Sequence, residues 1–290
     1  MIAYDNKAWY LHIFVWKGSV IKGILPRVII FMAWAALMIY LYDVDIIPGE
    51  RKIDMVIYNV VGLALGLLLV FRTNTSYDRY WEGRKLLGGM ANSCRNVALM
   101  LDNIIPYEDK EKRKDFAELI AAFNYAYKEH LRDGVKREDI PVLRDEYRDI
   151  VFKSKHVPLA IMKLLQKKAS ELQAINPANT IFIGLNKEMA AFVDNLGGME
   201  RIRNTPVPFA YPAHLQLFIM IYFLGLPFGL YEKFHWLSVP AVGAIALILL
   251  GINEIGVEIE DPFGDDPNDL PVDKICENIE KNVNQILLED

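Results

Sequence analysis

Four long stretches without a charged residue limit what this chain can fold into. They run from Val28 to Tyr42, Met55 to Phe71, Leu215 to Tyr231 and Trp236 to Asn253. Each holds 15 to 18 residues, slightly fewer than the roughly 20 apolar residues that cross a bilayer as a helix. Buried helices in the core of a soluble domain are therefore an alternative.

Residues at the edges of these stretches favour the membrane. Arg27 and His214 have side chains that can reach the membrane interface, and counting outward to them gives spans of sufficient length. The chain is 53% hydrophobic yet 24% charged, with a mean hydropathy of +0.16. We expect four transmembrane helices and a separate water-facing part.

The distribution of basic residues predicts the orientation. Bases cluster before the first span and after the second, whereas the first and last loops hold few; the two clusters are Lys7, Lys17, Lys22 and Arg27, and Arg72, Arg79, Arg84 and Lys85. Basic segments stay in the cytoplasm. We expect a multi-pass protein of the inner (plasma) membrane with both termini cytoplasmic.

The rest of the chain has helical periodicity and no strand-like alternation of useful length. The second span continues as one helix to Pro106, and further amphipathic helices follow, the last broken by Gly197 and Gly198; the prolines of Thr205 to Tyr211 predict an extended connector. The expected fold is all-α, divided into 1–71 (interfacial segment and two spans), 72–211 (helical cytoplasmic region), 212–253 (two spans) and 254–290 (acidic tail).

Several classes of protein are excluded. The N-terminus has no small-residue cleavage site and is predicted to be an interfacial amphipathic segment, not a signal peptide. A net charge of −5 argues against nucleic acid as a partner. Cys94 and Cys276 fall on the reducing side of the membrane and imply no disulfide. Common enzyme motifs are missing.

One carboxylate pair leaves an enzyme hypothesis open. Asp78 and Glu82 lie one helical turn apart at the cytoplasmic membrane surface and could hold a metal for chemistry on lipid headgroups. The same spacing is typical of ordinary helix salt bridges, since Arg79 and Lys85 flank the pair. We favour the salt-bridge interpretation.

A row of apolar residues marks the end of the second span. Leu63, Leu67 and Phe71 recur every four residues and share one helical face. Such a row could line a narrow pore, but packing against lipid or a neighbouring helix is the default. Gly62 and Gly66 form a GxxxG pair on an adjacent face, which favours close helix association there.

The tail carries an acidic cluster around a Pro-Phe-Gly turn. Its members are Glu258, Glu260, Asp261, Asp265, Asp266 and Asp269. Oxygen ligands brought together by a turn suit a hard cation such as calcium. A solvated acidic turn between two helices is the simpler interpretation.

Three blocks together resemble the bestrophins, specifically the prokaryotic branch. They are FRTNTSYDRYWEGRKLLGG at Phe71 to Gly89, TPVPFAY at Thr205 to Tyr211 and EDPFGDDPNDLP at Glu260 to Pro271. The resemblance covers nearly the whole chain. It implies a homopentameric ion channel, with five second spans around a central axis.

The resemblance also assigns residues. The positions that match the family's hydrophobic neck are Leu63, Leu67 and Phe71, and the best match to its cytoplasmic aperture is Ile181. The calcium site of the eukaryotic members matches Asp266 and Asp269. Pro267 and Asn268 stand where those members have an acidic run, which weakens the expectation of calcium or another divalent cation.

The permeating ion follows from the same resemblance. Prokaryotic bestrophins look like cation channels, so we expect conduction of small monovalent cations such as sodium. The acidic balance of the subunit agrees with this expectation. The alternative is an anion (chloride) channel, as in the eukaryotic branch, using helix dipoles or the positive ring edge of Phe71.

Overall fold

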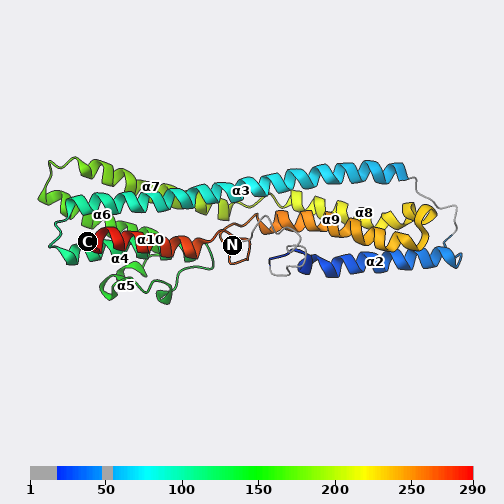
Figure 1. Ribbon diagram of the computed structural model, residues 1–290, viewed down its shortest axis with the longest axis horizontal. Helices are drawn as coiled ribbons and strands as arrows, with labels where there is room; N and C mark the ends of the chain where they lie inside the picture. Colours follow the sequence, from blue (N-terminus) through cyan, green and yellow to red (C-terminus); the bar gives the residue numbers. More distant parts are fainter. Residues whose placement is uncertain (1–17, 48–54, 290) are drawn as a thin grey trace. The chain divides into compact units, whose positions relative to one another are not determined.

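The computed structural model describes residues 18–47 and 55–289, and in these residues every regular element is helical (Figure 1). The predicted interfacial segment at the N-terminus lies outside the described residues. The elements are α2 (Ile21–Asp43), α3 (Met55–Ile104), α4 (Lys110–His130), η2 (Arg137–Asp139), α5 (Asp145–Val151), α6 (Val157–Ile175), α7 (Ile181–Asn204), α8 (Ala210–Phe234), η3 (His235–Leu237), α9 (Ser238–Glu258) and α10 (Val272–Leu288). The expectation of an all-α fold is confirmed.

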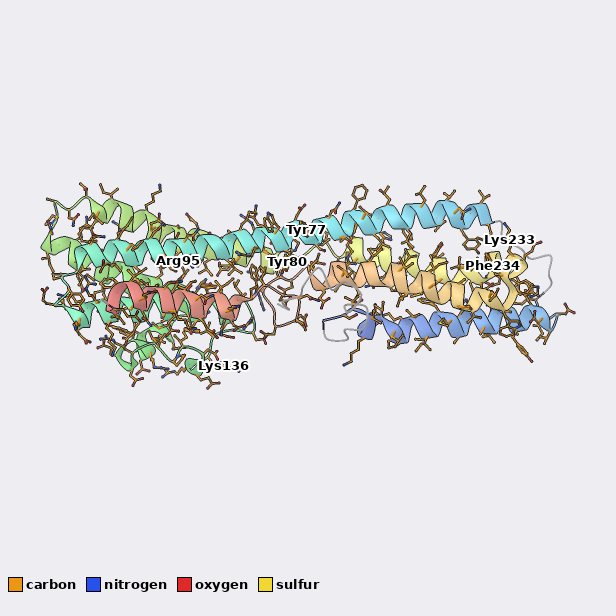
Figure 2. All side chains as sticks on the ribbon, in the orientation of Figure 1. Tyr77, Tyr80, Arg95, Lys136, Lys233 and Phe234 are labelled. Carbon is orange, nitrogen blue, oxygen red and sulfur yellow. The ribbon has the colours of Figure 1, made fainter. Side chains whose placement is uncertain are left out.

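The chain divides into two compact units. The first comprises the described residues within Met1–Tyr80, Pro206–Asp261 and Asp266–Asn268; the second comprises Trp81–Thr205, Pro262–Asp265 and Asp269–Asp290, again as far as they are described. Three stretches of the described chain are long and apolar enough to cross a membrane, namely Ile21–Asp43, Met55–Ile104 and Ala210–Glu258. The last contains both α8 and α9, with Lys233 and Phe234 at the end of α8 before the turn into α9 (Figure 2).

The first unit packs α2, α8 and α9 with the beginning of α3. In it α2 lies beside both α9 and α8 (Figure 1). Its hydrophobic core contains Ile24, Val28, Ala35, Tyr58, Leu65, Leu69, Leu215, Ile219, Phe223, Leu226, Leu230, Val242, Ala246 and Leu250. At the end of α2, Asp43 accepts hydrogen bonds from Tyr231 and Trp236, each with a donor–acceptor distance of 3.0 Å. Tyrosine and tryptophan with one polar end are typical of a membrane interface.

Helix α3 runs for 50 residues without interruption. It contains no proline and ends two residues before Pro106, because a residue that precedes proline is disfavoured in the α conformation. The prediction of one long helix reaching Pro106 is confirmed.

The second unit has its own core around α4. Helices α10 and α6 pack on α4, and Phe123 of α4 meets Phe192 of α7 with ring centroids 5.3 Å apart. The thiols of Cys94 and Cys276 are both buried in this unit. The amphipathic pattern of these helices accounts for their packing, since each has an apolar stripe to cover.

Two predicted boundaries are wrong. Helix α7 continues through Gly197 and Gly198 to Asn204, since a glycine costs only about 1 kcal/mol in a helix. Gly198 has a packing reason: a Cβ there would lie 2.7 Å from a methyl carbon of Leu86 on α3. The connector after α7 ends at Phe209, because α8 begins at Ala210 and includes Tyr211.

Candidate ion pathway

The first half of α3 has one buried face. Its buried residues are Tyr58, Leu65, Leu69, Arg72 and Ser76. At about 100° per residue, all five directions fall within about 30° on either side of a common centre. This seam is the side that α3 presents to the rest of the first unit.

The predicted neck residues lie on the opposite face of α3. Leu63, Leu67 and Phe71 are 78%, 55% and 55% exposed. With the same helical period, their directions centre about 180° from the seam. The described part of the chain therefore leaves this apolar row uncovered, where a pore, another copy of the chain or lipid can meet it.

The two glycines of the GxxxG pair have different neighbours. A Cβ at Gly62 would lie 3.2 Å from the hydroxyl oxygen of Tyr222 on α8, so this glycine allows α3 and α8 to approach closely. A Cβ at Gly66 would meet nothing within 4 Å in the described part of the chain. Of the pair, Gly62 alone faces a neighbouring helix of the subunit described here.

A buried arginine follows directly on the apolar row. Arg72 is 5% exposed; its Nη1 donates to Oδ1 of Asn253 over 3.2 Å, and its Nη2 lies 3.6 Å from Oε2 of Glu260. Glu260 also accepts from the backbone N–H of Val207 over 3.1 Å. A buried charge needs such partners, and here they join α3, the end of α9 and the connector before α8.

Sequence reasoning missed this polar cluster. Arg72 was considered as an orientation signal, Asn253 as the end of a span and Glu260 as part of an acidic run; Arg72 and Glu260 also fall in two of the sequence blocks, but nothing paired these residues. The partners are 181 and 188 residues from Arg72 in the chain. The available signal was that a basic residue and an amide each end an apolar stretch, at positions that two neighbouring helices could bring together.

The predicted aperture residue begins α7. Ile181 is half-buried and lines a hollow of about 530 Å³ with residues of α3, the N-cap of α7 and α7 itself: Asn96, Leu99, Met100, Asn103, Thr180 and Gly184. Ile183, two residues along, is 74% exposed. The role of Ile181 stays a prediction.

The two predicted calcium ligands of the acidic segment differ in burial and belong to different units. Asp269 is buried at 3% exposure, whereas Asp266 is exposed. They belong to different units, Asp266 to the first and Asp269 to the second. Between them, Asn268 donates from Nδ2 to the carbonyl of Gly18 over 2.9 Å. Metal binding by this pair stays a prediction.

The carboxylates of the enzyme hypothesis lie on α3. Asp78 is exposed, and Glu82 pairs with Lys85 over 2.8 Å, three residues along the same helix. This is the salt bridge of the simpler interpretation.

Comparison with known proteins decides the family. The profile of the family described as Bacterial/Fungal Bestrophin protein matches residues 1–285. The chain belongs to this bestrophin family. The three sequence blocks had predicted this membership, and the prediction is confirmed.

Known proteins are similar in sequence to this chain over nearly their whole length. The chain is 36% identical over 286 residues to the voltage-dependent anion channel-forming protein alr2987 of Nostoc sp., covering 97% of this chain and 92% of that protein. It is 29% identical to the voltage-dependent anion channel-forming protein YneE of Escherichia coli, covering 99% and 94%. The crystal structure of a bacterial bestrophin homolog from Klebsiella pneumoniae has a TM-score of 0.86 at 26% identity, covering 92% and 99%.

The bestrophin fold and family membership set the class of the protein. It is a bestrophin-type channel protein and a multi-pass membrane protein, not an enzyme.

Proposed function

We propose that five copies of the chain form an ion channel, with α3 of each subunit lining a central pore at Leu63, Leu67 and Phe71. The observation that supports this proposal is the exposure of the three residues on the face of α3 opposite its packed seam. Fivefold assembly would turn each residue into a ring and enclose the apolar row. Ile181 is proposed as the cytoplasmic aperture.

The neck would act as a hydrophobic gate. Leucine and phenylalanine side chains offer no ligands for an ion, so such rings control passage by dewetting and by movement of side chains. The Arg72 cluster would hold the gate in position. It anchors α3 to Asn253 and Glu260 on the side of the helix away from the apolar row.

The proposed topology has four crossings per subunit. They are α2, the first part of α3, α8 and α9, with both termini and residues 72–211 and 254–290 in the cytoplasm. The basic bias after the second span supports this orientation. Asp266 and Asp269 are proposed as ligands of a divalent cation in the cytoplasmic tail.

We propose anions, such as chloride, as the permeating ions. The support is that the Nostoc and Escherichia coli relatives are described as anion channel-forming proteins. The names of these relatives thus favour the alternative over our first expectation of sodium. The cation channel is kept as the second candidate because the subunit carries a net charge of −5.

Two measurements test the assembly and the selectivity. Native mass spectrometry of the purified protein should give five times the 33.2 kDa subunit mass. In a planar bilayer with asymmetric NaCl, the reversal potential should move towards the chloride equilibrium potential. A shift towards the sodium potential selects the second candidate, and a folded pentamer that passes no current contradicts channel function.

A further inference from the structure

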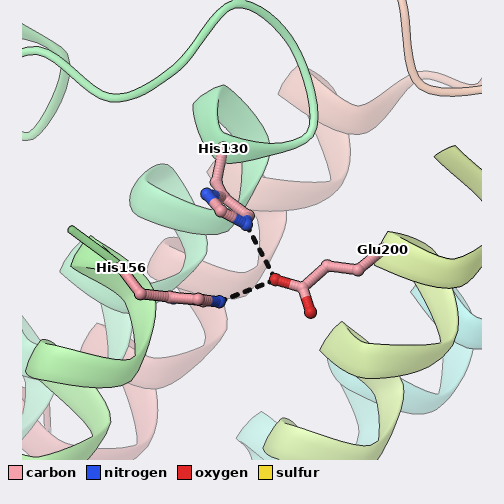
Figure 3. A group of neighbouring side chains, drawn as sticks. All are labelled: His130, His156 and Glu200. Atoms are coloured by element: carbon pink, nitrogen blue, oxygen red, sulfur yellow. Dashed lines mark hydrogen bonds and ion pairs between the residues drawn. The ribbon is translucent and has the colours of Figure 1, made fainter. Parts of the chain in front are cut away.

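Three side chains from three helices of the second unit converge on one carboxylate oxygen (Figure 3). Nε2 of His130 lies 2.7 Å from Oε1 of Glu200, and Nε2 of His156 lies 2.8 Å from the same oxygen. The two imidazole rings are 4.4 Å apart between centroids. Glu200 is 70 residues from His130 and 44 residues from His156, so no local sequence motif predicts this group.

The local structure holds each member of the group in place. His130 is the last residue of α4, His156 is the N-cap of α6, and Glu200 lies near the end of α7. Nδ1 of His156 accepts a hydrogen bond from the backbone N–H of Leu159 over 3.3 Å, which directs Nε2 towards Glu200. The three side chains are 26% to 30% exposed, so an ion can reach them from solvent.

We propose that His130, His156 and Glu200 bind one Zn²⁺ per subunit. Two imidazole nitrogens and one carboxylate oxygen are donors that zinc prefers, and their ligand atoms lie within 4.8 Å of one another. Zinc bonds of about 2.0–2.1 Å in a tetrahedron separate neighbouring donors by about 3.3 Å. The two nitrogen–oxygen distances therefore need to open by roughly half an ångström, which small side-chain rotations supply.

Binding has a defined proton balance. In the metal-free group each Nε2 that donates to Glu200 carries a proton; when the metal takes that position, the proton of each neutral ring moves to Nδ1, so the rings release no net proton. Neutral His156 must then carry its proton on Nδ1, so the hydrogen bond from Leu159 is lost when zinc binds.

Three ligands leave the fourth tetrahedral position of zinc open to water. The metal would connect the end of α4, the start of α6 and α7, the helix that begins at Ile181. This site is separate from the neck, and its test does not depend on ion current.

The test is zinc binding by the purified full-length protein after removal of metal with a chelator. Competition against a chromophoric chelator should show one tight Zn²⁺ per subunit. His130→Ala and His156→Ala should each weaken binding by about a hundredfold or more, and Glu200→Gln by at least about tenfold. His214→Ala, a histidine of the first unit, is the matched control and should bind as the parent does.

Two further measurements complete the test. Zinc-edge X-ray absorption should show two imidazole ligands, and unchanged oligomer mass of each variant shows that it has folded. If a variant does not fold, Glu200→Gln, which keeps the size of the side chain, takes its place. A parent protein that binds no tight zinc, or a His130→Ala/His156→Ala double variant that binds zinc as tightly as the parent, overturns the proposal in favour of a metal-free hydrogen-bonded cluster.

Discussion

Arg72 and Glu260 lie 3.6 Å apart, guanidinium nitrogen to carboxylate oxygen, at the point where the apolar part of α3 ends. Arg72 directly follows Phe71, the last residue of the proposed neck, yet its side chain is on the packed seam of α3. The neck and its anchor are thus consecutive residues that point in different directions. This arrangement connects the position of the neck to the stability of the first unit.

Removing the anchor should destabilise the protein. Arg72→Ala removes the guanidinium that Asn253 and Glu260 contact, and the free energy of unfolding should fall by about 1–3 kcal/mol. Thermal unfolding of the detergent-solubilised protein measures this loss. Arg84→Ala, at an exposed position of the same helix, is the control and should change stability by less than about 0.5 kcal/mol. Equal stability of the two variants contradicts the role of Arg72.

Replacement of two adjacent glycines in α7 by alanine should change the stability of the protein in opposite directions. Gly198→Ala places a Cβ 2.7 Å from Leu86, so overpacking should cost about 1–3 kcal/mol. Gly197→Ala meets nothing within 4 Å among the described residues and should stabilise α7 by up to about 1 kcal/mol. Chemical unfolding of the two variants gives the comparison. A more stable Gly198→Ala protein would show that α3 and α7 do not approach so closely.

The second unit should lose stability in acid through Asp273. Hydrogen bonds from Arg132, with a further contribution from Lys128, lower the pKa of this carboxyl from 3.8 to about 2. Because the pKa is lower in the folded state, the stabilisation is complete above about pH 4 and is lost as the pH falls towards 2. The group is partly exposed, so the effect should be at most about 1 kcal/mol.

Melting temperatures between pH 2 and 5 test this dependence. Asp273→Asn should flatten the curve in that interval and lower stability at neutral pH. Asp145→Asn is the control, since its side chain is fully exposed although it pairs with Arg148. If the melting temperature of Asp273→Asn depends on pH in the same way as that of the parent, Asp273 is not the source of the loss of stability in acid.

Local patterns in the sequence predicted much of the fold because the main determinants are local. Uncharged runs predicted α2, α8 and α9, and the helical periodicity that continues after Phe71 predicted that α3 reaches Pro106. The break at Gly197 and Gly198 was predicted wrongly, because a glycine in a helix is tolerated where a neighbour, here Leu86, needs the space.

The candidate site was predictable only in part. The row at Leu63, Leu67 and Phe71 is visible as a four-residue period, but its position opposite the packed seam depends on which residues of α3 the other helices cover. The Arg72 cluster and the group around Glu200 join residues far apart in the chain, and no pattern along the sequence pairs them.

Chemical modification of a single cysteine in the proposed neck tests whether Leu67 lines the pore. The native thiols provide an unreactive background, since both are buried and burial raises the pKa of Cys276 to about 12. Leu67→Cys places a thiol in the exposed row, and Leu69→Cys places one on the seam, where the native leucine is 1% exposed. The measurement is the current through a reconstituted bilayer before and after a charged methanethiosulfonate reagent. If Leu67 lines the pore, the reagent should cause a large, lasting change in current for Leu67→Cys and none for Leu69→Cys or the parent. A Leu67→Cys channel whose modified thiol leaves the current unchanged would show that Leu67 does not line the pore.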